Sequence, residues 1–128
     1  MDKHLLLEKT HHLCGKKIAR ECGLNYYTTR NFLIGRTKFP ENNLMEVIDD
    51  YCKKVGKELT TPWNYRPDYL RAKMKHLFIQ KISDETGFHY MTIRNFVIGF
   101  TMNPDPKMLD IIDEYCIKVG TELRRRCN

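Results

Sequence analysis

The stretch KKIARECGLNYYTTRNF, residues 16–32, is the most informative part of this chain about its fold. It predicts two short helices joined by a sharp turn, because Gly23 suits the left-handed backbone conformation that often follows a helix end. Asn25 is a favourable N-cap for the second helix. The small Ala19 would let the two helices approach closely where they cross. The side chains expected to share a small core are Ile18, Cys22, Leu24, Thr29 and Phe32.

The same stretch recurs later in the chain as QKISDETGFHYMTIRNF, residues 80–96. Gly87 follows Gly23 by 64 residues, and at this offset about half of the positions from His12 to Leu59 are identical to their counterparts. A unit of this length is longer than the helix pair of a solenoid repeat. The sequence therefore predicts one small domain present twice.

No segment alternates polar and apolar residues as a strand would, so the predicted class is all-α, with two tandem four- to five-helix domains. The predicted division is residues 1–59 for copy one, 60–67 for a linker and 68–128 for copy two. Asp2 is expected to cap a first helix that runs to about Leu13. The last helix of each copy carries an apolar stripe and is expected to end at Gly56 or Gly120. Trp63 and Tyr65 predict that the linker packs on the domains.

Composition bounds the class of protein. The chain has 128 residues, a net charge of +6 and five cysteines. A modest positive charge is compatible with a polyanionic partner. We expect no membrane span, no secretory signal and reduced thiols, as in a cytosol. No catalytic constellation stands out, so no enzyme activity and no cofactor are expected. His11, His12 and Cys14 lack a fourth ligand of matching spacing, so a zinc site is not expected.

The repeated stretch resembles the lambda repressor/Cro-like helix-turn-helix domains. The resemblance is carried by Ile18, Ala19, Gly23 and Leu24, by residues 28–31, by FLIG at 32–35 and by the basic loop ending in Pro40. It implies that the second helix of each motif enters the major groove of double-stranded DNA. It further implies a transcriptional regulator, with repression as the expected mode, in a bacterial or phage-infected host cytosol.

The resemblance implies the following roles. Candidates for contact with base edges, with Arg30 on either a base or a phosphate, are Tyr26, Tyr27, Thr28, Arg30 and Asn31 in copy one. Their equivalents in copy two are Tyr90, Met91, Thr92, Arg94 and Asn95. Phosphate candidates are Lys16, Lys17, Arg36, Lys38 and Lys81. The basic tail at 124–126 is a lesser candidate. Ion pairs of Arg30 with Glu21 and of Arg94 with Glu85 are the alternative for the two arginines.

The two copies differ at positions that such a domain would turn toward DNA. Phe100 and Met102 stand where copy one has Arg36 and Lys38. A monomer acting as a pseudo-dimer would therefore read two related but unequal half-sites. The main alternative is a protein-interaction module in which copy two, or both copies, hold a partner protein. A third interpretation is single-stranded nucleic acid stacking on the exposed tyrosines.

Overall fold

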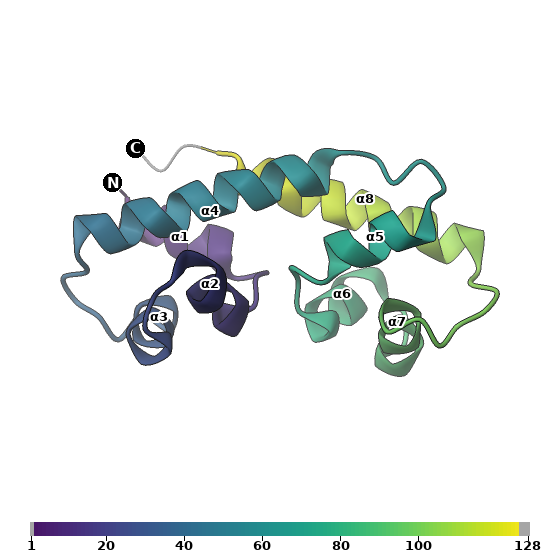
Figure 1. Ribbon diagram of the computed structural model, residues 1–128, viewed down its shortest axis with the longest axis horizontal. Helices are drawn as coiled ribbons and strands as arrows, with labels where there is room; N and C mark the ends of the chain where they lie inside the picture. Colours follow the sequence, from purple (N-terminus) through teal and green to yellow (C-terminus); the bar gives the residue numbers. More distant parts are fainter. Residues whose placement is uncertain (1, 126–128) are drawn as a thin grey trace.

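A computed structural model describes residues 2–125 of the chain (Figure 1). This part of the protein is all-helical, with no strand. None of its helices combines the length and the apolar character needed to cross a membrane. The helices are α1 (Lys3–Thr10), α2 (Gly15–Cys22), α3 (Tyr26–Leu33), α4 (Asn42–Thr60), α5 (Pro67–Met74), α6 (Ile79–Thr86), α7 (Tyr90–Val97) and α8 (Pro106–Leu123).

The helices follow the sequence repeat closely. Each of the first four helices begins 64 residues before its counterpart, from Lys3 and Pro67 to Asn42 and Pro106. The repeat therefore extends to the N-terminal side of His12, where Leu6 and Lys9 match Leu70 and Lys73 at the same offset. Asp2 caps α1 as expected, since its Oδ1 accepts hydrogen bonds from the backbone N–H groups of His4 and Leu5.

The turns between α2 and α3 and between α6 and α7 have the predicted local chemistry. Gly23 and Gly87 have φ values of 67° and 81°, in the region that glycine adopts without a steric penalty. Asn25 Oδ1 accepts a hydrogen bond from Thr28 N at 3.1 Å. In copy two the ring of His89 does the same for Met91 N at 3.2 Å. Two different side chains thus accept a hydrogen bond from a backbone N–H group in the first turn of the helix that follows.

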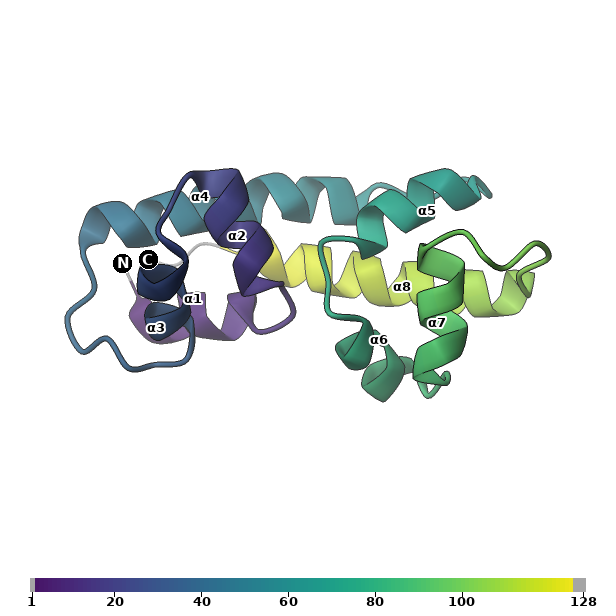
Figure 2. The same ribbon diagram turned by 60° about the horizontal axis from the view of Figure 1, so that its bottom comes forward.

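The long helices α4 and α8 lie side by side across the molecule and make its most extensive helix–helix contact (Figures 1 and 2). The buried side chains of both repeats form one continuous apolar cluster. Trp63, between α4 and α5, joins this cluster and donates its indole N–H to Asp110 at 3.3 Å. The predicted packing of the linker thus rests on Trp63, whereas Tyr65 is 78% exposed and its ring lies 5.4 Å from that of Trp63.

The predicted helix ends at Gly56 and Gly120 are also wrong. Both glycines lie inside helices, because α4 continues to Thr60 and α8 to Leu123. Their role is a close crossing: a Cβ on either glycine would lie 2.8 Å from the backbone oxygen of the other. Conversely, α1 ends earlier than predicted, at Thr10. Leu13 instead forms an antiparallel bridge with its own counterpart, Leu77.

Two buried lysines tie the repeats together. Lys9 Nζ lies 2.8 Å from Asp49 Oδ1 within copy one and also donates to the backbone oxygen of Arg125 in copy two. Lys73 repeats this arrangement with Asp113 in its own copy and with the backbone oxygen of Thr61 in the other. Each ammonium group thus joins a carboxylate of its own repeat to the chain of the other repeat.

Two histidines make a second set of contacts between the repeats. His76 Nε2 lies 3.0 Å from Glu58, and His12 Nε2 lies 3.7 Å from the equivalent Glu122. His12 Nδ1 also pairs with the Tyr115 hydroxyl at 2.9 Å. The two repeats therefore face each other through matching residues, as the protomers of a two-fold dimer would.

Candidate nucleic-acid interface

The helices α3 and α7 lie on the side of the molecule opposite α4 and α8 (Figures 1 and 2). Apolar side chains on their inner faces hold them in place: Phe32 is buried on α3, and Ile93 and Phe96 are buried on α7. Thr29, the counterpart of Ile93, is buried too, and its hydroxyl donates to the backbone oxygen of Asn25 at 2.9 Å. The remaining faces of both helices are available to solvent.

None of the residues predicted to touch DNA is buried. Arg30 and Arg94 are exposed, and neither forms an ion pair within residues 2–125. The alternative pairing with Glu21 and Glu85 is therefore not formed. Also exposed are Lys16, Tyr27, Thr28, Arg36, Lys38, Tyr90, Met91 and Thr92; half-buried are Lys17, Tyr26, Asn31, Lys81 and Asn95.

Aromatic and basic side chains gather at the start of α3. Lys16 Nζ lies 5.9 Å from the centroid of the Tyr26 ring, within the range of a cation–π contact. The Tyr26 and Tyr27 rings are 5.5 Å apart in an edge-to-face arrangement. The side chain of Tyr27 is 71% exposed, so it is free to contact a partner that binds against α3. Copy two has no such pair of rings, because Met91 replaces Tyr27.

Three of the predicted contact residues, Asn31, Asn95 and Lys17, also have roles within the fold. Asn31 and Asn95 are at the far ends of α3 and α7, where their backbone oxygens accept from Arg36 N and Phe100 N at 2.9 and 2.8 Å. Lys17 faces the boundary between the repeats, where its charge helps to lower the pKa of His76. The two asparagines therefore stabilise the turns after α3 and α7, and Lys17 lies at the boundary between the repeats, whether or not they contact a partner.

The loops that follow α3 and α7 carry exposed apolar side chains. Phe39 is 92% exposed in the first loop, and Phe100 and Met102 are 75% and 91% exposed in the second. The basic pair Arg36 and Lys38 occurs only in the first loop. Lys3 of α1 anchors that loop by donating to the backbone oxygen of Lys38 at 3.2 Å.

One contact between the repeats has no symmetric counterpart in the sequence. Lys81 of α6 and the ring of His11, which follows α1, are hydrogen-bonded at 2.6 Å, Nζ to Nε2. The ammonium is the donor, so His11 Nε2 is its acceptor. In the repeat, His11 corresponds to Lys75 and Lys81 to Lys17, so the symmetric contact would join two lysines. The only sequence signal for this contact is that break in the repeat.

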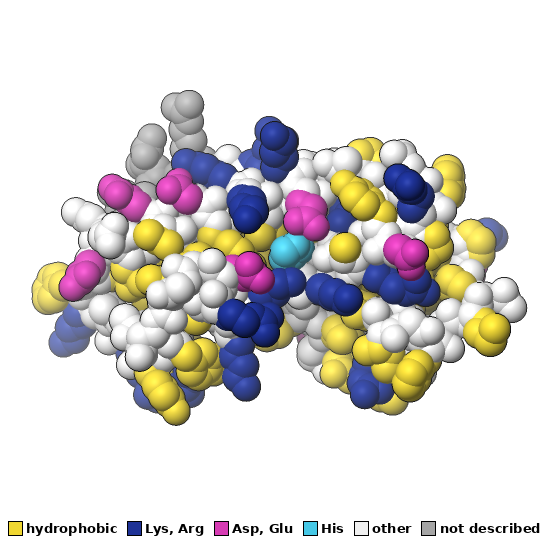
Figure 3. All heavy atoms as spheres, viewed as in Figure 1, with side chains coloured by type: hydrophobic (Ala, Val, Ile, Leu, Met, Phe, Trp, Pro, Cys, Tyr) yellow, Lys and Arg dark blue, Asp and Glu magenta, His cyan; other side chains and the backbone are white. Residues whose placement is uncertain are grey.

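The charges are unevenly distributed over the surface. In the view of Figure 3, the lower edge shows Lys and Arg side chains but no Asp or Glu, and α3 and α7 lie at this edge. Basic side chains also gather at the boundary between the repeats. Lys and Arg side chains also lie along the upper edge of this view, so the positive charge is not confined to the predicted contact residues. Such a surface attracts a polyanion and weakens in salt.

Two thiols near the core, those of Cys22 and Cys116, have raised pKa values. Burial raises the pKa of the Cys116 thiol to about 12, and it raises that of Cys22 as well. A thiolate nucleophile or metal ligand is disfavoured at both positions. Within residues 2–125 no group of three or more His, Cys, Asp or Glu side chains is arranged to hold a metal ion. Arg126, part of the basic tail, lies outside the described residues.

The chain was compared with known protein families, curated proteins and solved structures. No protein-family model, no curated protein and no solved structure matches the chain.

Proposed function

We propose that this protein binds double-stranded DNA as a single chain. In this proposal α2–α3 and α6–α7 are two helix-turn-helix units of the lambda repressor/Cro-like kind. Their second helices, α3 and α7, enter successive major grooves. The observation that carries the proposal is the placement of α3 and α7 on one side of a shared core, each with an exposed arginine.

The chemistry of these faces suits base recognition. Arginine can donate two hydrogen bonds to guanine, and threonine and asparagine can pair with several base edges. Adjacent major grooves on one side of B-DNA are about 34 Å apart, a separation that a dimeric reader spans with two heads. Here a covalent chain and a shared core would hold the heads in one order. Binding by the first head then raises the effective concentration of the second to the order of mM.

The two heads would read unequal half-sites. Tyr27 and Arg36 of copy one correspond to Met91 and Phe100 of copy two, so the second head offers fewer polar groups. A regulator built in this way binds an asymmetric operator in one orientation only. Transcriptional regulation is the proposed role, with repression by occupancy as its simplest form.

Selection of duplexes from a random library, followed by anisotropy titration, tests this proposal. We expect a motif with two unequal parts, about one helical turn apart from centre to centre. Arg30→Ala and Arg94→Ala should each weaken binding at least several-fold, with unequal penalties, while Lys118→Ala, at an exposed lysine of α8, should not. Neutralising about six phosphates gives a log–log salt slope near −5. A flat salt response, or no loss in either arginine variant, contradicts the proposal.

A protein-interaction role is the second candidate, and the exposed Phe100 and Met102 favour it. Large apolar side chains that project from a loop are typical anchors for a protein partner. If the random-duplex selection yields no enrichment for the whole chain, this second function takes precedence. Enrichment of single strands alone would instead favour stacking on the tyrosines of α3.

A further inference from the structure

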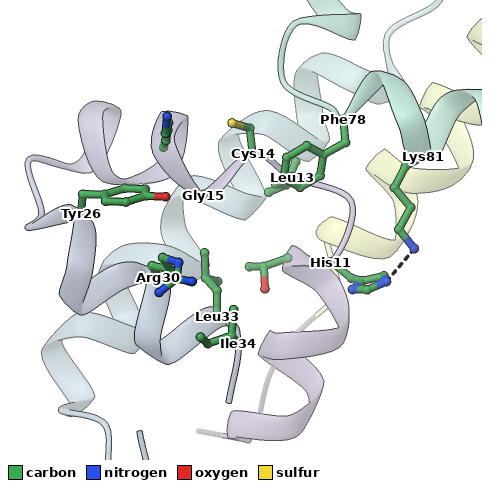
Figure 4. Close-up of a pocket in the computed structure, with 12 residues that line it drawn as sticks. His11, Leu13, Cys14, Gly15, Tyr26, Arg30, Leu33, Ile34, Phe78 and Lys81 are labelled. Atoms are coloured by element: carbon green, nitrogen blue, oxygen red, sulfur yellow. Dashed lines mark hydrogen bonds between the residues drawn. The ribbon is translucent and has the colours of Figure 1, made fainter. Parts of the chain in front are cut away.

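A pocket of about 420 Å³ opens beside α3, where α1, α2 and the start of α6 meet (Figure 4). Its volume lies in the range of natural small-molecule sites. Both repeats contribute to its wall, since Phe78 and Lys81 come from copy two. The site therefore exists only because the repeats are packed together.

The lining separates into an apolar part and a basic part. Leu13, Cys14, Leu33, Ile34 and Phe78 supply the apolar wall. The ring of Tyr26 extends this wall on the side of α3 (Figure 4). The charged or titratable nitrogen groups are His11, Lys16, Arg30 and Lys81, and no acidic residue among the described ones belongs to the lining. A ligand that complements this pocket has an apolar body and a negative charge.

Lys81 is positioned to bind such a charge. Its ammonium has three N–H groups, and the hydrogen bond to His11 at 2.6 Å uses one of them. The side chain is half-buried, so its electrostatic attraction for an anion is screened less than that of a fully exposed lysine. Figure 4 shows Lys81 and Arg30 on opposite sides of the apolar residues.

Gly15 accounts for part of the open space. It is not among the glycines with positive φ, so its backbone does not demand a glycine. A Cβ at this position would lie 3.2 Å from Leu33 Cδ1, at the wall of the pocket. In copy two the equivalent residue is Ile79, at the same first position of the helix. Copy two thus carries a bulky side chain at the place where copy one leaves room.

We propose that this pocket is a binding site for a small aromatic anion, with the ring between Tyr26, Leu33 and Phe78. The anionic group lies against Lys81, and Arg30 lies on the opposite side of the apolar residues. Lys16, Tyr26, Arg30 and Lys81 also belong to the proposed DNA interface. A bound anion therefore neutralises part of that interface and competes with the duplex, a consequence that rests on the proposed function.

The site can be measured directly on the whole chain without DNA. The probe is 8-anilino-1-naphthalenesulfonate, whose fluorescence rises in apolar surroundings, and its uncharged analogue is N-phenyl-1-naphthylamine. We expect saturable binding of one probe per chain. Gly15→Ile should weaken both probes at least tenfold, and Phe39→Ser, which removes a remote exposed ring, should leave both unchanged. The double variant Gly15→Ile/Leu33→Val, which copies the residues of the second repeat, guards against strain in the single one.

A charge variant tests the anion specifically. Lys81→Met should weaken the sulfonate probe about tenfold and leave the uncharged probe within twofold. Equal losses for both probes overturn the recognition of an anion. Probe binding that Gly15→Ile and the double variant do not affect, while circular dichroism shows both to be folded, overturns the site itself.

The competition is tested last, with a duplex that the wild-type chain binds. Saturating sulfonate probe should lower the duplex affinity at least fivefold, and Gly15→Ile should bind the duplex normally but ignore the probe. Unchanged duplex affinity at saturation overturns the competition. If no duplex binds, the proposed function fails while the fluorescence titration still decides whether the pocket is a ligand site.

Discussion

Among single residues, Lys9 and Lys73 stand out because their ammonium groups are buried in the core. Both side chains are fully buried, and each lies against an aspartate and a backbone oxygen of the other repeat. Such a pair repays the cost of desolvation only when both partners are present. Loss of one partner leaves a buried charge without compensation.

Asp113→Ala should therefore lower the free energy of unfolding by about 3–5 kcal/mol, because Lys73 would stay buried beside no carboxylate. The measurement is urea denaturation followed by circular dichroism. Glu114→Ala, at the exposed neighbouring position, is the matched control and should change stability by no more than about 0.5 kcal/mol. The double variant Lys73→Met/Asp113→Leu should recover most of the loss. A loss near that of the control would show that Lys73 reaches water.

The histidines at the boundary between the repeats make stability depend on pH. Burial is the largest cause that lowers the pKa of His12 and of His76, and it outweighs the attraction of Glu122 and Glu58. In addition, His76 Nδ1 is buried and has no hydrogen-bond partner within residues 2–125. Since the unfolded chain binds protons more readily than the folded one, acid favours unfolding.

The contribution of these histidines is fully present above a pH of about 6.5, the ordinary value for histidine, and is lost as the pH falls toward their lower folded values. We expect the melting temperature to fall between pH 7.5 and 5.5. The variant His12→Gln/His76→Gln should show a smaller change over this interval, and His4→Gln, at an exposed position, should not. A melting temperature that rises on acidification would contradict the direction of both shifts.

At the scale of elements, the crossing of α4 and α8 depends on two residues without side chains. Gly56 and Gly120 face each other so closely that a Cβ on either would lie 2.8 Å from a backbone oxygen. Neither has the positive φ that would require glycine. Their conformational cost in a helix, about 1 kcal/mol each relative to alanine, is offset by the packing that the close approach allows.

Gly120→Ala should destabilise the fold by about 1–3 kcal/mol, even though alanine is the better helix former. The added methyl group meets backbone and the Cβ of Leu59, so the helices must separate. Thr121→Ala, an exposed neighbour on the same helix, is the control. The comparison is made by thermal denaturation, and an increase in stability for Gly120→Ala would mean that the crossing is looser than the structure has it.

The sequence predicted the elements better than their assembly. Local rules were sufficient for Asp2, Asn25 and Gly23, because the partners of a cap or turn lie within a few residues. Gly56 was misjudged because a glycine near the end of an apolar stripe has the same local signature whether it ends a helix or lies at a crossing. The burial of Lys9 and the pocket beside α3 depend on residues of the other repeat, which no local pattern specifies. The assignment of the exposed residues to DNA stays a prediction.

At the scale of the whole molecule, the two repeats behave as protomers fused into one chain. The contacts of Lys9, His12 and Leu13 with the second repeat are matched by those of Lys73, His76 and Leu77 with the first. Because one apolar cluster spans both repeats, neither repeat buries its own core alone. Unfolding should accordingly be a single cooperative transition.

This near-symmetry makes the first repeat complementary to itself. In a dimer of residues 1–66, Glu58 would take the place of Glu122, Thr61 that of Arg125 and Gly56 that of Gly120, since each pair is related by the repeat. In an isolated fragment, the apolar surface that α8 covers in the intact chain would face water. Exposing apolar surface costs a free energy of about 25 cal/mol per Å². The fragment should therefore fold only as a homodimer, with helicity that depends on its concentration.

Sedimentation equilibrium and circular dichroism on residues 1–66 provide the measurement. We expect a folded dimer at micromolar concentration and a loss of helicity on dilution. Gly56→Leu in the same fragment should abolish both association and helicity, since the side chain blocks the crossing of the two copies of α4. A folded monomer would mean that copy one has a sufficient core of its own. A fragment that stays unfolded at high concentration would mean that the differences between the repeats, rather than their common residues, hold α4 against α8.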